Sequence, residues 1–382
     1  MTRTDPLPSW REQLTATVSD RPAEGFSAEG VRGLFLSGPQ WRGADTEIFA
    51  WYGCPDGPGP HPAMVLVHGG GGTAFDDWVR LWTSRGFAAI AMDTCGCTAG
   101  GEHSQRPRHE HGGPPGWCGA TQIDWPITDQ WPWHATAAVI RAHNWLRQQS
   151  EVDEKRIGIT GVSWGGVITC WTSSVDHRLA CAAPVYGCGY QSMSPKFPSE
   201  AAQLGVHDRW CGQWDPQFVL NQVTCPTLWV NGDEDFAFPL DAWAASGEQI
   251  TQATVQRSIH HAMAHGQSQG AEPEELHAFA RHHLCGGPAL PMLSAPHQQD
   301  GRLHAMVTTD VTIASAECIL SADTGLWNER EWRLTEANYG AHTGMVSAAM
   351  AETDRAGMLT VITADGLRLS TRPWDRDTPE GP

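Results

Sequence analysis

The sequence predicts an α/β fold, in which helices flank a mostly parallel sheet, followed by a small β-rich domain. Two observations lead there. Short apolar runs alternate with helical patterns up to about residue 289, and strand-like segments without intervening helices follow from residue 290. At 382 residues, the chain is long enough for about two domains. We therefore expect a main domain over 1–289 and a small β-rich domain or extension over 290–382, with a tail wrapped on the main domain as the alternative.

The apolar runs and helical patterns predict the elements in order. Strands are expected at 63–68, 87–93, 156–160, 179–185, 226–230 and 254–261, with helices at about 75–84, 130–149, 167–174 and 273–284. Short strands follow at 302–309, 316–320, 329–334 and 358–364. The segments at about 94–129 and 186–222 lack periodicity and are expected to be long loops beside the active site, because loops of that length are usually functional.

Composition and charge exclude several classes of protein. The formal net charge is −18, and Lys155 and Lys196 are the only lysines, so the sequence does not predict the positively charged surface that binds nucleic acid. No uninterrupted apolar run approaches the roughly 18 residues of a membrane span. The first eight residues lack a secretory pattern, and the eleven cysteines include no Cys-x-x-Cys pair, so we expect a cytoplasmic protein with reduced thiols. The oligomeric state stays open.

A serine between glycines carries the strongest chemical signal. Gly161-Val-Ser163-Trp-Gly165 follows a predicted buried strand and precedes a predicted helix. This is the context of the Gly-x-Ser-x-Gly turn, in which glycines avoid collisions with the neighbouring strand and helix. We predict Ser163 as a catalytic nucleophile, and a purely structural turn is the alternative.

A serine hydroxyl needs a base, and the base needs an acid to orient it. The expected chain order is serine, acid, histidine. Asp235, on an acidic loop after the strand at 226–230, is the predicted acid, with Asp233 as its rival. His265, just past the next strand, is the predicted base, whereas His260 and His261 are expected to be structural. His261 and His265 also have the spacing of two zinc ligands on a helix, but no third ligand is evident, so we expect no metal.

Acyl transfer also requires backbone N–H groups that stabilise an oxyanion. The run His68-Gly-Gly-Gly-Gly72 follows the first predicted strand and offers an unobstructed backbone. We predict that Gly71 or Gly72 donates one hydrogen bond and Trp164 the other. A phosphate-binding loop is the alternative, although the run lacks a Gly-Lys-Ser/Thr ending.

Nineteen tryptophans are many for this length. Several fall on predicted loops over the active edge of the sheet, namely Trp117, Trp125, Trp131, Trp133, Trp210 and Trp214. Flat aromatic faces suit sugar rings or apolar groups, so we predict a substrate platform formed by Trp131, Trp133, Trp210 and Trp214. Ordinary core or lid positions are the alternative.

The chain resembles the dienelactone-hydrolase-related and acetyl xylan esterase-like α/β-hydrolases from about residue 30 to 290. The similar stretches are 68–75 with Trp78 and Trp82, 91–96, 129–131 with His134, 156–166, 185–189, 231–239 and 263–266 with 273–275. The resemblance implies an α/β-hydrolase fold and the triad of Ser163, Asp235 and His265. It departs from the cephalosporin-deacetylase branch, since Trp164 replaces a glutamine and Gly266 a glutamate.

The resemblance implies a serine carboxylesterase that works without a cofactor. The expected substrate is a small-molecule or carbohydrate ester of a small acyl group such as acetate. A serine peptidase of the acyl-peptide or prolyl type and a catalytically silent binding protein are the alternatives. The former usually carries a large N-terminal propeller, whereas only about 60 residues precede Ala63 here.

Overall fold

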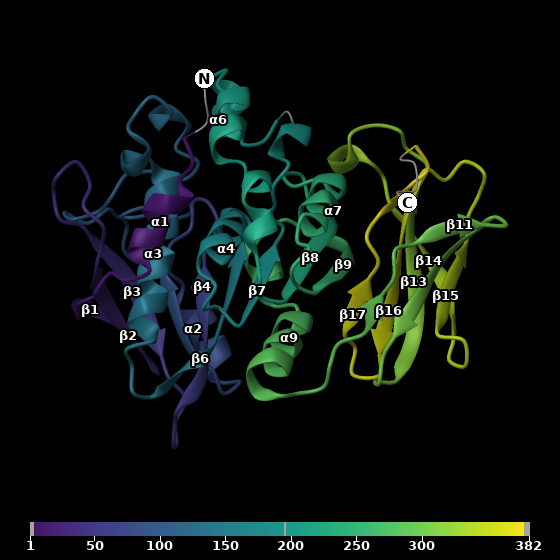
Figure 1. The fold of residues 1–382 in the computed structure, drawn as a ribbon, viewed down its shortest axis with the longest axis horizontal. Coiled ribbons are helices and arrows are strands. Elements are labelled where there is room, and N and C mark those ends of the chain that lie inside the picture. The colour runs from purple at the N-terminus through teal and green to yellow at the C-terminus, as the bar shows by residue number, and fades with distance from the viewer. Residues whose placement is uncertain (1–3, 195, 378–382) are drawn as a thin grey trace.

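The computed structural model describes residues 4–194 and 196–377, and within them a large sheet forms the centre of the main domain. Its strand order is β1-β2-β3-β5-β4-β6-β7-β8-β9 (Figure 1). The strands are β1 (Asp20–Ala28), β2 (Val31–Ser37), β3 (Glu47–Gly53), β4 (His61–Val67), β5 (Ala88–Met92), β6 (Val152–Val162), β7 (Cys181–Val185), β8 (Thr227–Glu234) and β9 (Val255–Ala264). The first three are antiparallel, and the strands from β5 to β9 run parallel.

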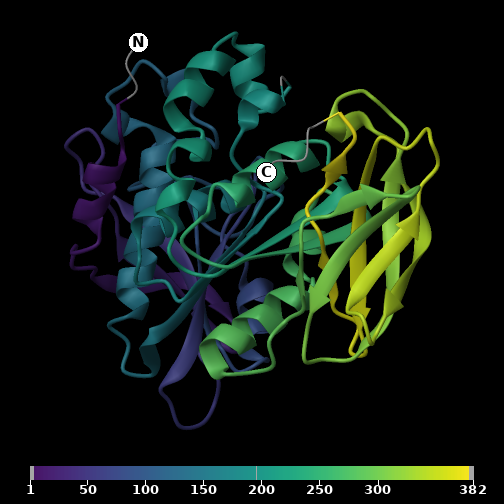
Figure 2. The same ribbon diagram turned by 45° about the vertical axis from the view of Figure 1, so that its right-hand side comes forward.

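Helices cover both faces of this sheet (Figures 1 and 2). They are α1 (Leu7–Gln13), α2 (Asp76–Thr83), α3 (Trp131–Leu146), α4 (Trp164–Val175), α5 (Ser199–Gln203), α6 (His207–Trp214), α7 (Leu240–Glu248), α8 (Gln267–Ala271) and α9 (Glu274–Cys285). Parallel strands need such crossover helices, which bury both faces of the sheet. No helix in the described ranges is long and apolar enough to cross a membrane.

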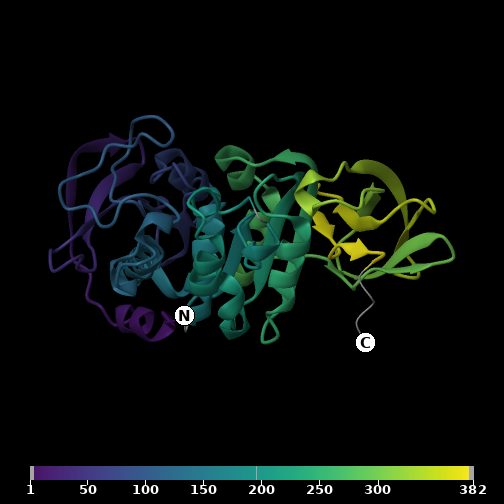
Figure 3. The ribbon, with the colours of Figure 1, turned by 90° about the horizontal axis from the view of Figure 1, so that it is seen from above.

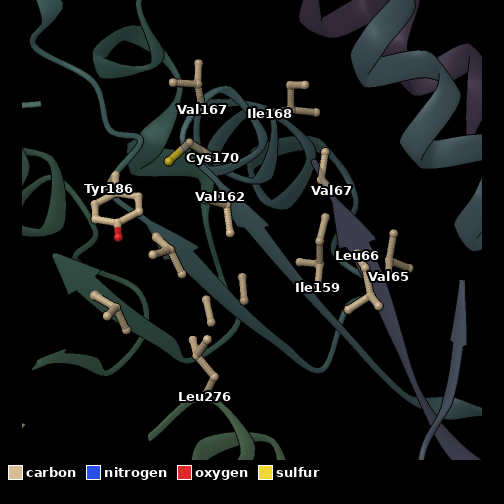
Figure 4. Packing of buried hydrophobic residues seen from close by; sticks show 14 of the residues in the cluster. Val65, Leu66, Val67, Ile159, Val162, Val167, Ile168, Cys170, Tyr186 and Leu276 are labelled. Atoms are coloured by element: carbon tan, nitrogen blue, oxygen red, sulfur yellow. The ribbon is translucent and has the colours of Figure 1, made fainter. Parts of the chain in front are cut away.

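The core lies where the central strands meet α4. Val65, Leu66 and Val67 on β4 and Ile159 on β6 are fully buried, and Figure 4 shows them beside Val167 and Ile168 of α4. Strands buried on both faces are apolar throughout rather than alternating, which explains the continuous apolar runs of the sequence. This packing fixes the turn between β6 and α4, where Ser163 lies.

The C-terminal region forms a separate antiparallel β structure at the β9 edge of the main sheet (Figures 2 and 3). Its strands are β10 (Met292–Leu293), β11 (His297–Gln299), β12 (Arg302–Thr308), β13 (Ile313–Ser321), β14 (Arg333–Gly340), β15 (Met345–Ala349), β16 (Ala356–Thr363), β17 (Arg368–Ser370) and β18 (Trp374–Asp375).

Hydrogen bonds tie this region to the main domain. The Ile259 N–H on β9 donates to Ser370 Oγ at 3.0 Å, and the Arg368 N–H donates to Glu275 Oε1 at 2.5 Å. The Gln256 side chain donates to the Leu290 carbonyl at 3.1 Å. The outer side of β9 is therefore covered rather than left as an exposed sheet edge.

The predicted fold class is confirmed, and the structure corrects several local predictions. Residues 20–53, for which no element was predicted, form three strands that extend the sheet. The predicted loops contain short helices: Ala120–Gln122 and Ile127–Asp129 in the first, and Gln191–Met193, α5, α6, Pro216–Phe218 and Leu220–Gln222 in the second. The strand expected at 329–334 is instead a turn of 3₁₀ helix, η6 (Trp327–Glu329), followed by β14.

Candidate active site

Ser163 lies on a strained turn between β6 and α4. Its backbone has φ 60° and ψ −119°, which is unfavourable for a residue with a side chain. The neighbouring backbone leaves no room for other side chains, because a Cβ on Gly165 would lie 2.0 Å from the Val67 carbonyl oxygen and one on Gly161 would lie 2.2 Å from the Gly165 oxygen. The glycines therefore hold the serine at the carboxyl end of the parallel strands.

His265 connects this serine to a buried carboxylate. His265 Nε2 lies 2.8 Å from Ser163 Oγ, and His265 Nδ1 lies 3.0 Å from Asp235 Oδ1. The same Asp235 oxygen accepts the N–H groups of Ala237 and Phe238 at 2.7 and 3.1 Å, which fixes its position. The structure thus brings together the three residues that were predicted as a triad.

Three aromatic rings pack against His265, and that of Phe238 is stacked on the imidazole with centroids 6.0 Å apart. The Tyr186 ring centroid lies 4.6 Å from that of the imidazole, and the Phe236 centroid lies 5.1 Å away. The Tyr186 hydroxyl donates to the Ala264 carbonyl at 3.0 Å, and burial raises the pKa of this phenol, so it remains a neutral donor. The imidazole is therefore held by its two hydrogen bonds and by these rings.

A second aspartate–histidine pair lies beside the first. Asp233 Oδ2 lies 2.6 Å from His261 Nδ1, and Asp233 Oδ1 accepts the Ala262 N–H at 2.8 Å. Ala262 has φ 57°, so the Asp233 carboxylate holds an unusual bend near the end of β9. Asp233 does not bond to His265 in this geometry. His261 and His265 each bond a different carboxylate. His261 lies on β9 and His265 on the loop after it, so the two do not have the helical arrangement that their spacing suggested for zinc ligands.

The glycine run places a different residue at the serine than predicted. The Gly72 N–H donates to the Gly69 carbonyl at 3.1 Å and is therefore already engaged, and neither Gly71 nor Gly72 lines the pocket. Gly70 does line it, and a Cβ on Gly70 would lie 2.6 Å from the Trp164 ring. Within the described residues, the N–H groups of Gly70 and Trp164 have no hydrogen-bond partner. Gly70 is therefore a further candidate donor, and Trp164 is retained; the predicted Gly71 stays a prediction, because among the described residues its N–H also has no partner.

His68, which begins the glycine run, supports the turn. Its Nε2 accepts the Thr94 N–H at 3.1 Å, and its Nδ1 lies 2.7 Å from the Gly69 carbonyl oxygen. Burial lowers the pKa of His68, so the ring stays neutral and Nδ1 can donate to that carbonyl. The histidine therefore fixes the backbone that leads to Gly70.

An open pocket of about 570 Å³ contains Ser163 and His265. Its wall combines aromatic and polar groups from both parts of the chain. The other lining residues are Gly70, His103, Trp117, Trp164, Lys196, Phe197, Ser199, Phe236, Asn328 and Glu329. Asn328 and Glu329 belong to the C-terminal region, which sequence reasoning did not connect with the site.

The four tryptophans predicted to form the substrate platform do not line the pocket. Trp131, Trp210 and Trp214 are at most 1% exposed, and Trp133 is 5% exposed. Their indole N–H groups are engaged: Trp131 donates to the Thr94 carbonyl, Trp210 to the Cys118 carbonyl, Trp214 to the Gln130 side chain and Trp133 to Ser9 Oγ. These rings pack behind the loops, whereas Trp117, which was also among the predicted loop tryptophans, lines the pocket together with Trp164.

Together, the fold and this site define the class of the protein. A strained serine at the carboxyl edge of a parallel sheet, with a histidine beside it, is the arrangement that performs nucleophilic hydrolysis in α/β-hydrolases. The chain has the α/β-hydrolase fold, and its family matches indicate a serine hydrolase. Its sequence matches the acetyl xylan esterase (AXE1) family over residues 40–193 and the prolyl oligopeptidase family over residues 127–286.

Solved structures share the fold. An acetyl xylan esterase from a Paenibacillus species has a TM-score of 0.56 and 22% identity, covering 74% of this chain and 96% of its own. Acetyl xylan esterase 1 from a Thermoanaerobacterium species has a TM-score of 0.54 and 18% identity, covering 74% and 93%. An acylaminoacyl peptidase from Pyrococcus horikoshii has a TM-score of 0.51 and 20% identity, covering 68% of this chain but only 42% of the peptidase.

Proposed function

We propose that this protein is a serine carboxylesterase that cleaves a small acyl group from an alcohol, with Ser163, His265 and Asp235 as its catalytic triad. The hydrogen-bonded path from Ser163 Oγ through both nitrogens of His265 to Asp235 carries the proposal, because it is what a serine needs in order to attack an ester. The match to the acetyl xylan esterase family supports an ester as the substrate.

The proposed reaction proceeds in two halves. Ser163 Oγ attacks the ester carbonyl carbon and passes its proton to His265 Nε2, while the N–H groups of Gly70 and Trp164 stabilise the carbonyl oxygen as it becomes negative. The bond to the alcohol oxygen then breaks, and His265 returns the proton to that oxygen. Water attacks the acyl-serine in the same way, which releases the acid and restores Ser163 and His265.

The surroundings of Gly70 favour a small acyl group. A Cβ built on Gly70 would lie 2.6 Å from the Trp164 ring and 2.8 Å from the Trp117 ring, so both indoles lie against Gly70. Phe197 packs against the Trp164 ring with centroids 5.4 Å apart. Acetate fits such an aromatic corner better than a long chain does. Polar side chains such as Ser199 and Glu329 also line the pocket and suit a carbohydrate alcohol.

A peptidase is the second candidate, favoured by the match to the prolyl oligopeptidase family. An ester and an anilide with the same acyl group separate the two. We expect p-nitrophenyl acetate to be hydrolysed far faster than p-nitroacetanilide, and rates should fall as the acyl chain grows from acetate to octanoate. Faster cleavage of peptide anilides than of any ester would favour the peptidase instead.

The nucleophile is tested by Ser163→Ala. This variant should lower kcat by a factor on the order of 10⁴ to 10⁶, because losing the nucleophile removes the effect of the whole triad. Circular dichroism and thermal unfolding should show that the variant is folded. A folded Ser163→Ala protein with nearly unchanged turnover of p-nitrophenyl acetate would contradict the assignment.

A further inference from the structure

The pocket wall next to His265 comes from the C-terminal β region. Asn328 and Glu329 line the pocket and form part of η6, far along the chain from the triad. Both lie outside the segments 40–193 and 127–286 that match the two families. The C-terminal region is thus a part of the site that the family matches do not describe.

This wall lies on the side where the alcohol must leave. The Asn328 side-chain amide donates to the Phe236 carbonyl at 2.8 Å, and the Phe236 ring packs against His265. In the proposed reaction, the alcohol oxygen receives its proton from His265 Nε2 and must therefore lie within hydrogen-bond reach of it. In the same reaction, the carbonyl oxygen lies at the N–H groups of Gly70 and Trp164. The alcohol oxygen lies beside His265 instead, close to Phe236, the residue that Asn328 bonds.

The segment is anchored, so it can present side chains in a fixed position. Trp327 is 8% exposed and lines a cleft with Ala244 and Ala245 of α7. The Arg330 guanidinium covers the outer face of this ring, with its carbon 4.1 Å from the ring centroid. Together with the bond from Asn328 to Phe236, these contacts hold η6 against the main domain at the two residues that precede Glu329.

Glu329 meets Lys196 across the mouth of the pocket. The two side chains form an ion pair, and they are 48% and 74% exposed. Exposed ion pairs of this kind contribute little net free energy, so a substrate can readily separate them. Once freed, the Glu329 carboxylate can accept two or more hydrogen bonds from hydroxyl groups. The exposed Phe236 ring beside it supplies a flat apolar surface.

We propose that Glu329 binds hydroxyl groups on the alcohol of the substrate, and that Trp327 and Asn328 act as positioning residues that hold it there. The inference rests on the proposed esterase function. The selectivity for the alcohol then depends on the C-terminal region. The preferred substrates are esters of alcohols that contain a ring with free hydroxyl groups.

The test compares two acetate esters of equal ring size. One is a methyl pyranoside that carries a single acetyl group and free hydroxyls, and the other is cyclohexyl acetate, which has no hydroxyls. The wild type should prefer the pyranoside. Glu329→Ala should raise KM for the pyranoside about 5- to 20-fold with little change in kcat, because a hydrogen bond to a charged group is lost at a partly exposed site. The ratio of kcat/KM for the two esters should fall by the same factor.

Three further variants separate binding from other effects. Glu329→Gln should restore part of the preference, since the amide oxygen still accepts a hydrogen bond. Lys196→Ala breaks the same ion pair without removing the carboxylate and should not reproduce the loss. Glu331→Gln changes an exposed carboxylate two residues away that does not line the pocket, and it should leave the ratio unchanged.

The outcomes distinguish this inference from the proposed function. Equal effects of Glu329→Ala on both esters, or equal losses in Lys196→Ala and Glu329→Ala, would overturn the role of Glu329 while leaving the esterase intact. A wild-type preference for cyclohexyl acetate would do the same. If the wild type hydrolyses neither of these esters nor p-nitrophenyl acetate, the proposed function itself fails.

Discussion

The two aspartates near the site differ by what their oxygens contact. Asp235 bonds His265, whereas Asp233 bonds His261 and the backbone of Ala262. The sequence left a choice between them because both follow the same strand within three residues of one another. Only the way in which the end of β9 bends decides which carboxylate meets which ring, and this bend has no signature in the spacing.

Asp235→Asn is expected to lower kcat strongly, on the order of 10⁴-fold, because an amide favours the wrong tautomer of His265. Asp233→Asn leaves the bond between Asp235 and His265 in place and should lower kcat far less. Steady-state kinetics with p-nitrophenyl acetate would measure both variants. A greater loss in Asp233→Asn than in Asp235→Asn would reassign the acid.

Among the elements, a buried charge cluster joins α3 to the end of α4. Asp176 accepts hydrogen bonds from His143 at 2.8 Å and from Arg178 at 2.7 Å, and the Asp176 and His143 side chains are fully buried. Burial opposes ionisation of Asp176, but the bonds from Arg178 and His143 outweigh it and hold the pKa of this carboxyl well below its usual range. The ionised form therefore stabilises the fold behind Ser163.

Asp176→Asn should lower the free energy of unfolding by about 3 to 5 kcal/mol at pH 7, the usual effect of removing one partner of a buried pair. A depressed pKa contributes stability that is fully present above the unfolded value of about 3.9 and is lost as the pH falls through the folded value. The difference between wild type and variant should therefore shrink below about pH 4. Urea unfolding at several pH values would measure it.

The control for this prediction is Asp208→Asn, since Asp208 is fully exposed on α6. It should change the stability little at any pH. If Asp176→Asn is equally harmless at pH 7, the cluster does not stabilise the junction of α3 and α4.

The success of sequence-based prediction differed between elements for a physical reason. The strand and glycine patterns at 63–72 and 156–166 are strong because β4 and β6 are buried on both faces. The strand β1 is mostly exposed, and its burial pattern does not alternate, so no apolar pattern in the sequence predicts it.

The tryptophans of α3 and α6 were expected at the surface, yet their burial depends on which loops pack over them. Asn328 and Glu329 reach the pocket only through tertiary packing and carry no local signal.

At the scale of the whole molecule, the C-terminal region protects the β9 edge of the main sheet. A truncated chain ending at Ala289 would lose the contacts of Ser370 and Arg368 and would expose an unpaired strand, which promotes association between sheets. We expect this truncated protein to aggregate and to unfold at a lower temperature than the full chain. Light scattering and thermal unfolding would test this.

The matched control is Ser370→Ala, which removes the bonds of Ser370 Oγ to the Ile259 N–H and to Thr360 Oγ1 and should lower the free energy of unfolding by about 1 to 3 kcal/mol without aggregation. A truncated chain that keeps the size distribution and unfolding temperature of the full protein would show that the edge needs no cover.

The pocket is lined by residues from Gly70 to Glu329, and this span has a consequence for biosynthesis. A ribosome produces residues 163, 235 and 265 before it reaches η6, and domains of growing chains generally fold in order of synthesis. A nascent chain could therefore assemble the proposed triad while the wall beside His265 is still inside the ribosomal tunnel. During that interval the proposed esterase would be unselective, and the proposed preference for the alcohol would begin only once η6 has been made and has folded.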